Sequence, residues 1–311
     1  MSRISTASSS RRSAADDGTI PPVPERPEEI RSALAALGVR PSKEWGQSFL
    51  TDPFVADAEA ALVEVKPGQP VVEVGGGLGV LTAALLRRGL GPLTVIERDR
   101  RLARFLSSTF GADIRVVTGD ALTVPLPPAE AVVGNLPYAV ATPLLLRLFA
   151  ARTPRVVFLV QQEVAERLAA GPGSKTYGRL SIIAQLYGSV ELFRTVGPDA
   201  FYPRPEVVSR IGVHVGRREP LPVPSVPALE EVLRKLFSSR RKQLSNLLPR
   251  VTSKSATPEE LARRARWPDD WARRRPETLP AEAFFALARA IADGDDSAPT
   301  GTHSPIDLGR P

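Results

Sequence analysis

Four successive apolar segments, each ending at a glycine or a polar residue, constrain the fold of this chain more than any other feature. The four ends are Gly75, Glu97, Asp120 and Asn135. Segments with helical spacing alternate with these apolar segments, a pattern that predicts a parallel sheet. Parallel strands direct their carboxyl ends to one edge of the sheet, where open α/β folds bind ligands. The sequence therefore predicts an α/β fold with a site built from these four positions.

The first strand, Pro70 to Val74, runs into a glycine turn and then into a helix beginning at Val80. The pattern from Glu73 to Gly79 is Glu-x-Gly-x-Gly-x-Gly, and glycines allow a tight turn and close approach of a ligand. The dinucleotide fingerprint needs a small residue at Val80, so a nicotinamide dehydrogenase is disfavoured. An acid before the turn suits a cationic or amino-bearing ligand better than a pyrophosphate. A purely structural βα turn is the alternative.

The next two strand ends carry carboxylates. Glu97 lies 22 residues past Gly75, the spacing at which such folds bind ribose hydroxyls, and a surface glutamate is the other interpretation. Asp120 ends the third strand, where its carboxylate would accept a hydrogen bond from an adenine amino group. Capping of the next turn explains Asp120 equally well.

The fourth strand ends in the loop Gly134-Asn135-Leu136-Pro137-Tyr138. Its chemistry suits methyl transfer to an exocyclic adenine amine, a poor nucleophile because its lone pair is delocalised into the ring. The Asn135 side-chain oxygen and the Leu136 carbonyl would accept both N–H bonds of that amine. Tyr138 would stack on a base turned out of its strand. A β-turn punctuated by proline is the plain alternative.

The bulk composition narrows the class of protein. The 311 residues are 42% hydrophobic and 24% charged, as in a globular protein with a sizeable core. The chain has no cysteine and only two histidines, His214 and His303, so disulfides and a transition-metal site are disfavoured. No apolar run reaches the ~18 residues of a membrane span, and the segment 1–17 lacks the apolar core of a secretory signal. We expect a cytoplasmic monomer without membrane association.

The chain divides into four predicted parts. Residues 1–27 and 293–311 are polar and predicted to be disordered. A catalytic domain spans 28–219, and a Pro-rich linker at 220–227 opens a helical domain, 220–292. We expect helices there at 229–237, 241–248, 258–266 and 280–292.

The helical domain carries most of the net charge of +7. Between Leu221 and Ala292 there are 14 Lys and Arg against 8 Asp and Glu, a net of +6. This excess predicts contact with RNA phosphates through Arg240, Arg241 and Lys242. A solvated helical face rich in arginine is the alternative.

Several stretches taken together resemble the rRNA adenine N6-dimethyltransferases, especially the bacterial KsgA type acting on small-subunit rRNA. The resemblance spans residues 41 to about 291. It rests on GQSFL (46–50), EVGGGLG (73–79), NLPY (135–138), QEVAER (162–167), YGRLS (177–181), FYPRP (201–205), FSSRRK (237–242) and RPETL (275–279). The glycine motif alone is common to many methyltransferases, whereas the set in this order is specific.

The resemblance implies a Rossmann-like class I methyltransferase sheet with a small all-helical C-terminal domain. It implies an S-adenosyl-L-methionine site lined by Ser48, Leu50, Gly75, Glu97, Asp120 and Asn135. It also implies that the target amine is handled by Asn135, Leu136 and Tyr138, with Phe201 near the base. A core phenylalanine under a Pro-rich loop is the alternative role for Phe201.

Three positions depart from the family pattern. Ser48 stands where Asn or His is usual, which puts a cofactor contact in doubt. Gly76 replaces the proline of a common GPG motif, and Val208 stands where an acid is common. None of these departures removes a residue assigned to catalysis.

The function implied by the resemblance is dimethylation of N6 of two adjacent adenosines near the 3′ end of small-subunit rRNA, during ribosome biogenesis. The substrate would be this rRNA or a pre-ribosomal small subunit, and no metal would be required. The alternatives are a resistance-type methyltransferase acting on large-subunit rRNA and a non-catalytic ribosome-assembly factor. The four intact strand ends argue against the last, because a pure binder does not need them.

Overall fold

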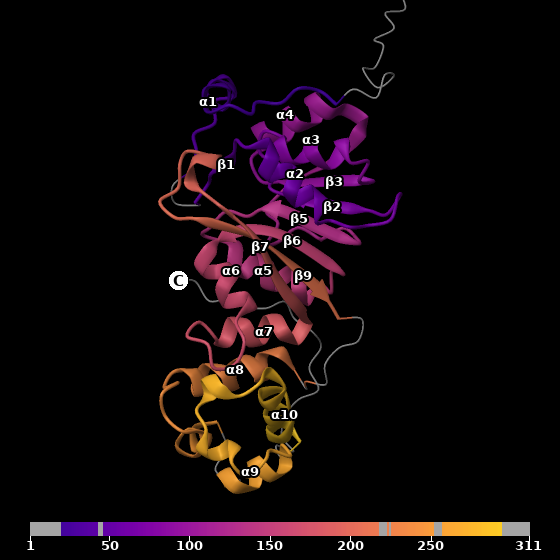
Figure 1. Ribbon diagram of the computed structural model, residues 1–311. Helices are drawn as coiled ribbons and strands as arrows, with labels where there is room; N and C mark the ends of the chain where they lie inside the picture. The colour runs from indigo at the N-terminus through magenta and orange to yellow at the C-terminus, as the bar shows by residue number, and fades with distance from the viewer. Residues whose placement is uncertain (1–19, 43–45, 218–222, 224, 252–256, 294–311) are drawn as a thin grey trace, which may run out of the picture.

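The computed structural model describes residues 20–42, 46–217, 223, 225–251 and 257–293. Its centre is a seven-stranded sheet in the order β4-β3-β2-β5-β6-β9-β7 (Figure 1). β4, β3, β2, β5 and β6 run parallel, and β9 and β7 are antiparallel to their neighbours. The strands are β2 (Val71–Val74), β3 (Leu93–Glu97), β4 (Ile114–Thr118), β5 (Ala131–Asn135), β6 (Arg155–Gln161), β7 (Gly188–Val196) and β9 (Ser209–Gly216). This topology confirms the predicted α/β fold.

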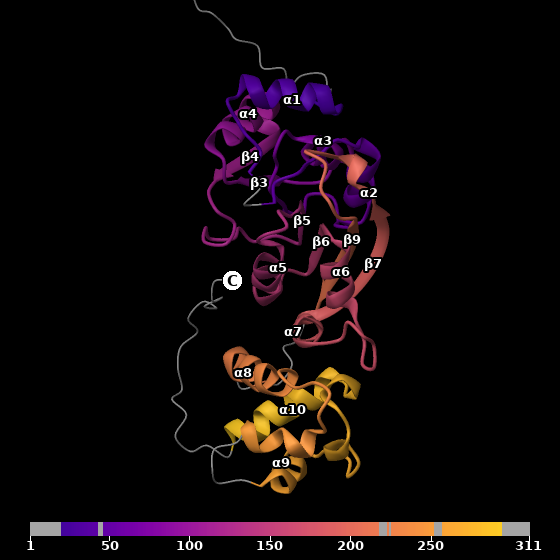
Figure 2. The same cartoon turned by 90° about the vertical axis from the view of Figure 1, so that its left-hand side faces the viewer.

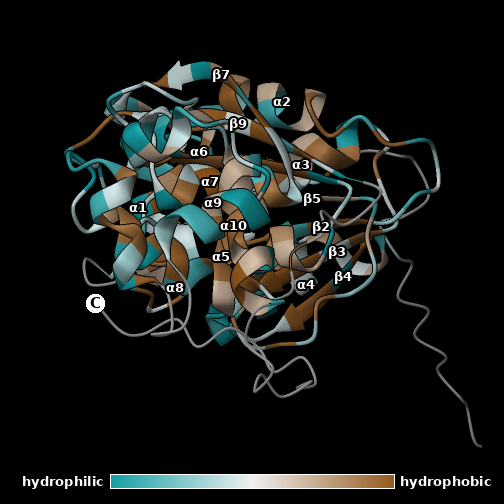
Figure 3. Cartoon of the chain, turned by 90° about the horizontal axis from the view of Figure 1, so that it is seen from below, coloured by the Kyte–Doolittle hydropathy of each residue, from teal (hydrophilic) through white to brown (hydrophobic). Residues whose placement is uncertain are grey.

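Helices cover both faces of the sheet, as buried parallel strands require. Alternate residues of one strand enter different cores, so that Val71 packs with α2 and α3 and Val72 with α5 and α7. Figure 3 shows the hydrophobic colouring of these central strands. The helices are α1 (Pro27–Ala36), α2 (Pro53–Ala61), α3 (Val80–Arg87), α4 (Arg100–Phe110), α5 (Ala141–Ala150), α6 (Gln162–Ala169) and α7 (Arg179–Tyr187).

A second, two-stranded sheet joins distant parts of the chain. β1 (Phe49–Leu50) pairs antiparallel with β8 (Phe201–Tyr202), so that Leu50 lies opposite Phe201. The N–H of Thr51 extends the ladder by donating to the carbonyl of Ala200 at 2.8 Å. The pairing therefore places the segment preceding α2 beside the segment preceding β9.

The C-terminal helices are α8 (Val226–Phe237), α9 (Pro258–Arg264) and α10 (Ala281–Ala292). They form a helical body beyond α7, at the far end from α1 (Figure 2). Their apolar side chains continue the core that contains α5 and α7. The exact domain limits of 28–219 and 220–292 stay predictions.

Two expectations about local structure differ from the fold. The segment 241–248, predicted to be helical, forms 3₁₀ turns at Leu244–Asn246 and Leu248–Arg250. The N–H of Leu244 donates to the carbonyl of Arg274 at 2.9 Å instead of within a helix, and Pro249 has no N–H to donate.

The part of the predicted N-terminal tail (1–27) from Ile20 onward is among the described residues. The apolar residues Ile20 and Val23 pack against the core cluster that contains α2 and α3, which accounts for the order of this segment. Residues 1–19 and 294–311, in the two predicted disordered tails, and most of the linker before Ser225 lie outside the described residues.

None of the described helices is long and apolar enough to span a bilayer.

Candidate active site

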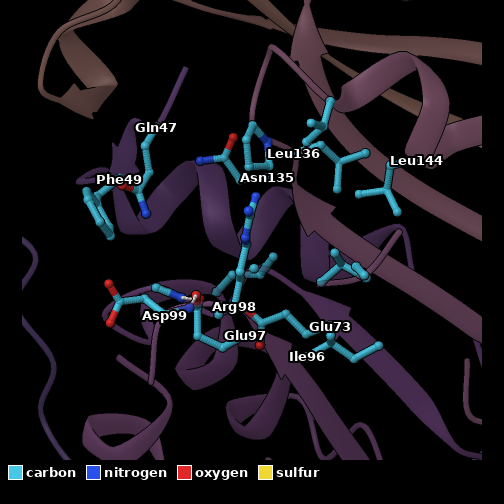
Figure 4. Close-up of a pocket in the computed structure, with 18 of the residues that line it drawn as sticks. Gln47, Phe49, Glu73, Ile96, Glu97, Arg98, Asp99, Asn135, Leu136 and Leu144 are labelled. Carbon is cyan, nitrogen blue, oxygen red and sulfur yellow. Dashed lines mark hydrogen bonds between the residues drawn. The ribbon is translucent and has the colours of Figure 1, made fainter. Parts of the chain in front are cut away.

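A pocket opens at the carboxyl edge of the parallel strands (Figure 4). It is lined by the ends of β2, β3 and β5, by the loop after β4 and by residues 46–50. All of the residues predicted to bind the cofactor line it, as do Leu136 and Tyr138. They are Ser48, Leu50, Gly75, Glu97, Asp120 and Asn135. Phe201 and the basic residues 240–242 do not.

The glycine turn between β2 and α3 has a conformation that only glycine adopts at low cost. Gly75, Gly77 and Gly79 have φ angles of 81°, 55° and 88°, in the left-handed region that L side chains avoid. A Cβ at Gly77 would also lie 3.2 Å from the Phe49 ring. The turn thus exposes backbone to the pocket, as a closely approaching ligand requires.

Gly76, which replaces the usual proline, is closed in by neighbouring side chains. A Cβ there would lie 2.4 Å from Val95 Cγ1 and 2.8 Å from Leu106 Cδ1. Larger residues on β3 and α4 therefore fill the space that a side chain at 76 would need. This packing restricts the turn at Gly76 even though the proline is absent.

Glu97 is held rigidly at the end of β3. One carboxylate oxygen accepts a hydrogen bond from the backbone N–H of Gly77 at 3.0 Å, and the other accepts one from the backbone N–H of Asp99 at 2.9 Å. Burial raises the pKa of this carboxyl group, while the backbone N–H donors oppose the shift. These bonds tie the glycine turn to β3 and orient the carboxylate at the pocket, where a diol would find an acceptor.

Asp120 follows β4, the strand that pairs with β3, and it also lines the pocket. One oxygen accepts from the N–H of Leu122 at 2.9 Å, so the turn-capping interpretation is correct for that atom. The other lies 3.5 Å from a guanidinium nitrogen of Arg98, a pocket residue that the sequence analysis missed. Figure 4 shows Arg98 extending between Glu97 and Asn135. Its position directly after a strand-ending acid was the signal that could have identified it.

Asn135 is oriented by the segment that precedes α2. Its side-chain nitrogen donates to the carbonyl of Ser48 at 3.2 Å, which leaves its side-chain oxygen as the acceptor available to a ligand. The Ser48 hydroxyl in turn donates to the carbonyl of Pro203 at 3.0 Å. Ser48 therefore uses its side chain to fasten the loop after β8 and its backbone to orient Asn135.

Tyr138 is fixed at its far end. Its hydroxyl lies 2.5 Å from the Ser209 hydroxyl at the start of β9, and burial raises the pKa of the phenol. A Cβ at Gly46, which has a φ of 60°, would lie 3.1 Å from the Tyr138 Cβ. The GQSFL and NLPY motifs therefore pack directly on each other.

Phe201 does not lie in the pocket. It is 3% exposed and belongs to the core cluster that contains Leu50 and Val196. This placement favours a core phenylalanine under the Pro-rich loop over an aromatic slot, because the ring is already covered by apolar neighbours. A contact with the base stays a prediction.

The carboxylates of the pocket match a positively charged ligand. Glu73, Glu97, Asp99 and Asp120 line it, with Arg98 as the cation. Glu73 is fully buried, and its Oε1 has no hydrogen-bond partner. Burial raises the pKa of Glu73 to about 8, so this group is neutral near pH 7. The backbone of the glycine turn and the carboxylate of Glu97 instead fit the amino and ribose groups of S-adenosylmethionine. Among the described residues, no group of three metal-binding side chains occurs.

Comparison with known proteins identifies this arrangement. Residues 39–264 match the model of the family described as ribosomal RNA adenine dimethylase. The chain belongs to this family. It is an S-adenosylmethionine-dependent rRNA adenine N6-methyltransferase, and the pocket is the site expected for the cofactor.

Individual relatives of the dimethylase cover most of the chain. A probable ribosomal RNA small subunit methyltransferase A of Natronomonas pharaonis is 38% identical over 84% of this chain and 97% of its own. Ribosomal RNA small subunit methyltransferase A of Deinococcus radiodurans is 42% identical over 71% and 77%. A Plasmodium falciparum dimethyladenosine transferase shares the fold at a TM-score of 0.66 and 24% identity, over 77% and 95%. The 23S rRNA methyltransferase ErmE has a TM-score of 0.61 at 25% identity, over 78% and 99%.

The basic residues of the dimethylase's helical body divide into two groups. Arg240 forms an ion pair with Glu277 at 2.6 Å and donates to the carbonyl of Lys175, so it joins the helical body to the loop before α7. Arg241 instead lines a groove with Arg273 and Arg275. The groove also contains Gln243, Arg274 and Thr278. Lys242 is exposed nearby in sequence.

Proposed function

We propose that this enzyme dimethylates N6 of two adjacent adenosines near the 3′ end of small-subunit rRNA during ribosome biogenesis. Relatives at 38% and 42% identity carry the small-subunit name. The substrate is then naked small-subunit rRNA or a pre-ribosomal particle. The cytoplasmic location and the monomeric state expected from the sequence stay predictions.

The orientation of Asn135 carries the catalytic part of the proposal. Its amide nitrogen is occupied by the Ser48 carbonyl, so its oxygen faces an incoming amine. That oxygen and the Leu136 carbonyl accept the two N–H bonds and draw the nitrogen lone pair out of the ring. Tyr138 offers its ring face to the base, and the Ser209 hydroxyl fixes the angle of that ring.

The cofactor would be held by Glu97 and Asp120, and it supplies an electrophilic methyl group. Glu97 presents acceptors for ribose hydroxyls. Much of the rate comes from positioning the two reactants. The proton leaves from the methylated, acidic amine, so no strong base is needed before attack.

The RNA contact of the helical body is proposed for the groove around Arg241. Three arginines of this groove, Arg241, Arg273 and Arg275, gather positive charge on one surface, as phosphate binding requires. Arg274 also lines the groove but pairs with Asp270 at 2.6 Å. Lys242 remains part of the proposed contact. Arg240 is removed from it because Glu277 already neutralises its charge.

The decisive test is a methyl-transfer assay with unmethylated small-subunit particles and, in parallel, large-subunit rRNA. Nucleoside mass spectrometry would detect dimethyladenosine in the small-subunit product, and Asn135→Ala would abolish it. The loss of one acceptor that acts in the transition state costs about 10²–10³ in kcat. Product in large-subunit RNA would instead favour a 23S rRNA methyltransferase activity like that of ErmE. Cofactor binding without any methylation would favour an assembly factor.

A further inference from the structure

An arginine outside the pocket joins the helix after the NLPY loop to the turn that carries Asp120. Arg147 lies in the last turn of α5, a helix that begins three residues after Tyr138. Its guanidinium donates to the carbonyl of Ala121 and, at 2.6 Å, to the carbonyl of Val124. Arg147 does not line the pocket itself, so its influence on a bound ligand must pass through this turn.

The turn after β4 is built around Asp120. The Asp120 carbonyl accepts from the N–H of Val124 at 2.9 Å. One of its carboxylate oxygens accepts from the N–H of Leu122, also at 2.9 Å. A Cβ at Gly119 would lie 2.3 Å from Val124 Cγ1, so the turn folds back onto the end of the strand. The carbonyls that Arg147 holds and the Asp120 carboxylate therefore belong to one small unit.

A guanidinium is well suited to holding this turn. Its donors point in fixed directions in one plane, so it binds two carbonyls at once, whereas a lysine ammonium is a compact point charge on a flexible stem. The Arg147 side chain is partly buried, and hydrogen bonds from a charged donor are roughly twice as strong as neutral ones. Two such bonds restrict both the position and the tilt of the turn.

A second arginine approaches the same turn from inside the pocket. One guanidinium nitrogen of Arg98 lies 3.5 Å from the Asp120 carboxylate, and the Arg98 side chain is 49% exposed. Solvent weakens an ion pair of this kind, and the contact is with the group that a ligand would use. Arg147 instead binds the backbone of the turn. The support from Arg147 is therefore compatible with a ligand on the carboxylate.

We propose that Arg147 is a positioning residue that fixes this turn and so aims the Asp120 carboxylate at the amino group of the cofactor's adenine. The inference rests on the cofactor role proposed above for Asp120 and not on the identity of the RNA. It also connects the two reactants. α5 follows the loop proposed to hold the target amine, and Leu144 of the same helix lines the pocket. One helix thus relates the adenine end of the cofactor to the target base.

A fixed carboxylate distinguishes adenine from hypoxanthine. The adenine amino group donates to a carboxylate, whereas the oxygen at the same position of hypoxanthine is an acceptor and would face the carboxylate without a proton between them. The enzyme should therefore bind S-adenosylhomocysteine more tightly than S-inosylhomocysteine. Once the turn is released from Arg147, the carboxylate is no longer held at the amino group and can move away from the oxygen. The preference should then shrink.

The test is calorimetric measurement of both dissociation constants without RNA. The wild-type enzyme should prefer S-adenosylhomocysteine by at least about tenfold, the worth of a hydrogen bond to a charged group. Arg147→Gln should lower this ratio at least about threefold, a part of that bond. Arg147→Lys keeps the charge but cannot span both carbonyls, so it should restore only part of the ratio. Arg152→Gln, at an exposed arginine just beyond α5, is the matched control and should leave the ratio unchanged.

A second arm uses the carboxylate itself. Asp120→Asn should abolish the preference, because an amide both donates and accepts and can bind either base. Adding Arg147→Gln to Asp120→Asn should then change the two affinities equally, since no preference remains to be lost. This non-additivity would show that Arg147 acts through Asp120.

Four results would overturn the inference. Equal weakening of both ligands by Arg147→Gln would indicate a general packing defect. A full ratio in Arg147→Lys would assign the effect to charge and not to the two carbonyl bonds. The absence of any preference in the wild-type enzyme would remove the proposed role of Asp120, and the inference with it, whereas a preference kept by Arg147→Gln would remove the inference alone. A crystal structure of the wild-type enzyme with S-adenosylhomocysteine needs no variant, and a guanidinium turned away from both carbonyls would be decisive against it.

Discussion

The hydrogen bond between Tyr138 and Ser209 allows the two roles of the tyrosine to be separated. The ring lines the pocket and the hydroxyl is fixed 2.5 Å from the Ser209 hydroxyl. If the ring stacks on the target base, Tyr138→Ala loses about 1–3 kcal/mol of stacking. This corresponds to about a 5- to 150-fold fall in kcat/KM.

Tyr138→Phe keeps the ring and removes only the hydrogen bond. Such a bond contributes about 0.5–1.5 kcal/mol, so we expect about a 2- to 12-fold fall. Ser209→Ala is the matched control, because it removes the same bond from the other side. If the hydroxyl acts only through this bond, the double variant Tyr138→Phe/Ser209→Ala should be no worse than the worse single variant.

The assay is steady-state methylation of unmethylated small-subunit particles, with cofactor binding measured separately for each variant. The reasoning would be refuted if Tyr138→Phe lost as much activity as Tyr138→Ala while Ser209→Ala stayed active. The hydroxyl would then act directly on the substrate, and the ring would have no stacking role.

Three further predictions follow from contacts described above. Arg241→Gln should lower the slope of log K for RNA binding against log salt concentration by roughly 0.7–0.9, as measured by filter binding. Arg240→Gln should leave this slope unchanged and lower the melting temperature, because Arg240 is already paired with Glu277. Gly76→Ala should cost about 1–3 kcal/mol in denaturant unfolding, because its Cβ would overlap Val95 and Leu106; an unchanged midpoint would contradict the packing described. Burial lowers the pKa of His214 to about 4, so between about pH 6.5 and pH 4 only the unfolded state binds a proton at this residue. The free energy of unfolding should therefore fall by up to about 3 kcal/mol as pH falls through this range. His214→Leu should flatten that pH dependence.

The sequence alone was sufficient to predict the pocket, because the residues that line it stand at the ends of strands that can be recognised locally. Each strand is an apolar run, and parallel pairing alone brings Gly75, Glu97, Asp120 and Asn135 to one edge. The helix at 141–150 and the cap formed by Asp52, which accepts from the N–H of Phe54, also follow from local residues.

The features that escaped prediction depend on partners distant in sequence. The pairing of Arg240 with Glu277 and the pairing of Phe201 with Leu50 arise only in the folded chain. Arg98 was overlooked because a charge after a strand is usually solvated. The burial of Glu59 did carry a signal, since an acid at helical spacing among Val55, Ala56 and Val63 marks a buried position.

The two-stranded sheet makes the site depend on residues that lie far along the chain. Leu50 pairs with Phe201, Ser48 holds Pro203, and Tyr138 is fixed by Ser209. A ribosome-bound chain that ends before residue 209 has its glycine turn and NLPY loop but lacks the partners that orient them. Closing contacts of such long sequence separation also form late in folding. The orientation of Tyr138 therefore depends on Ser209, which lies 71 residues later in the chain.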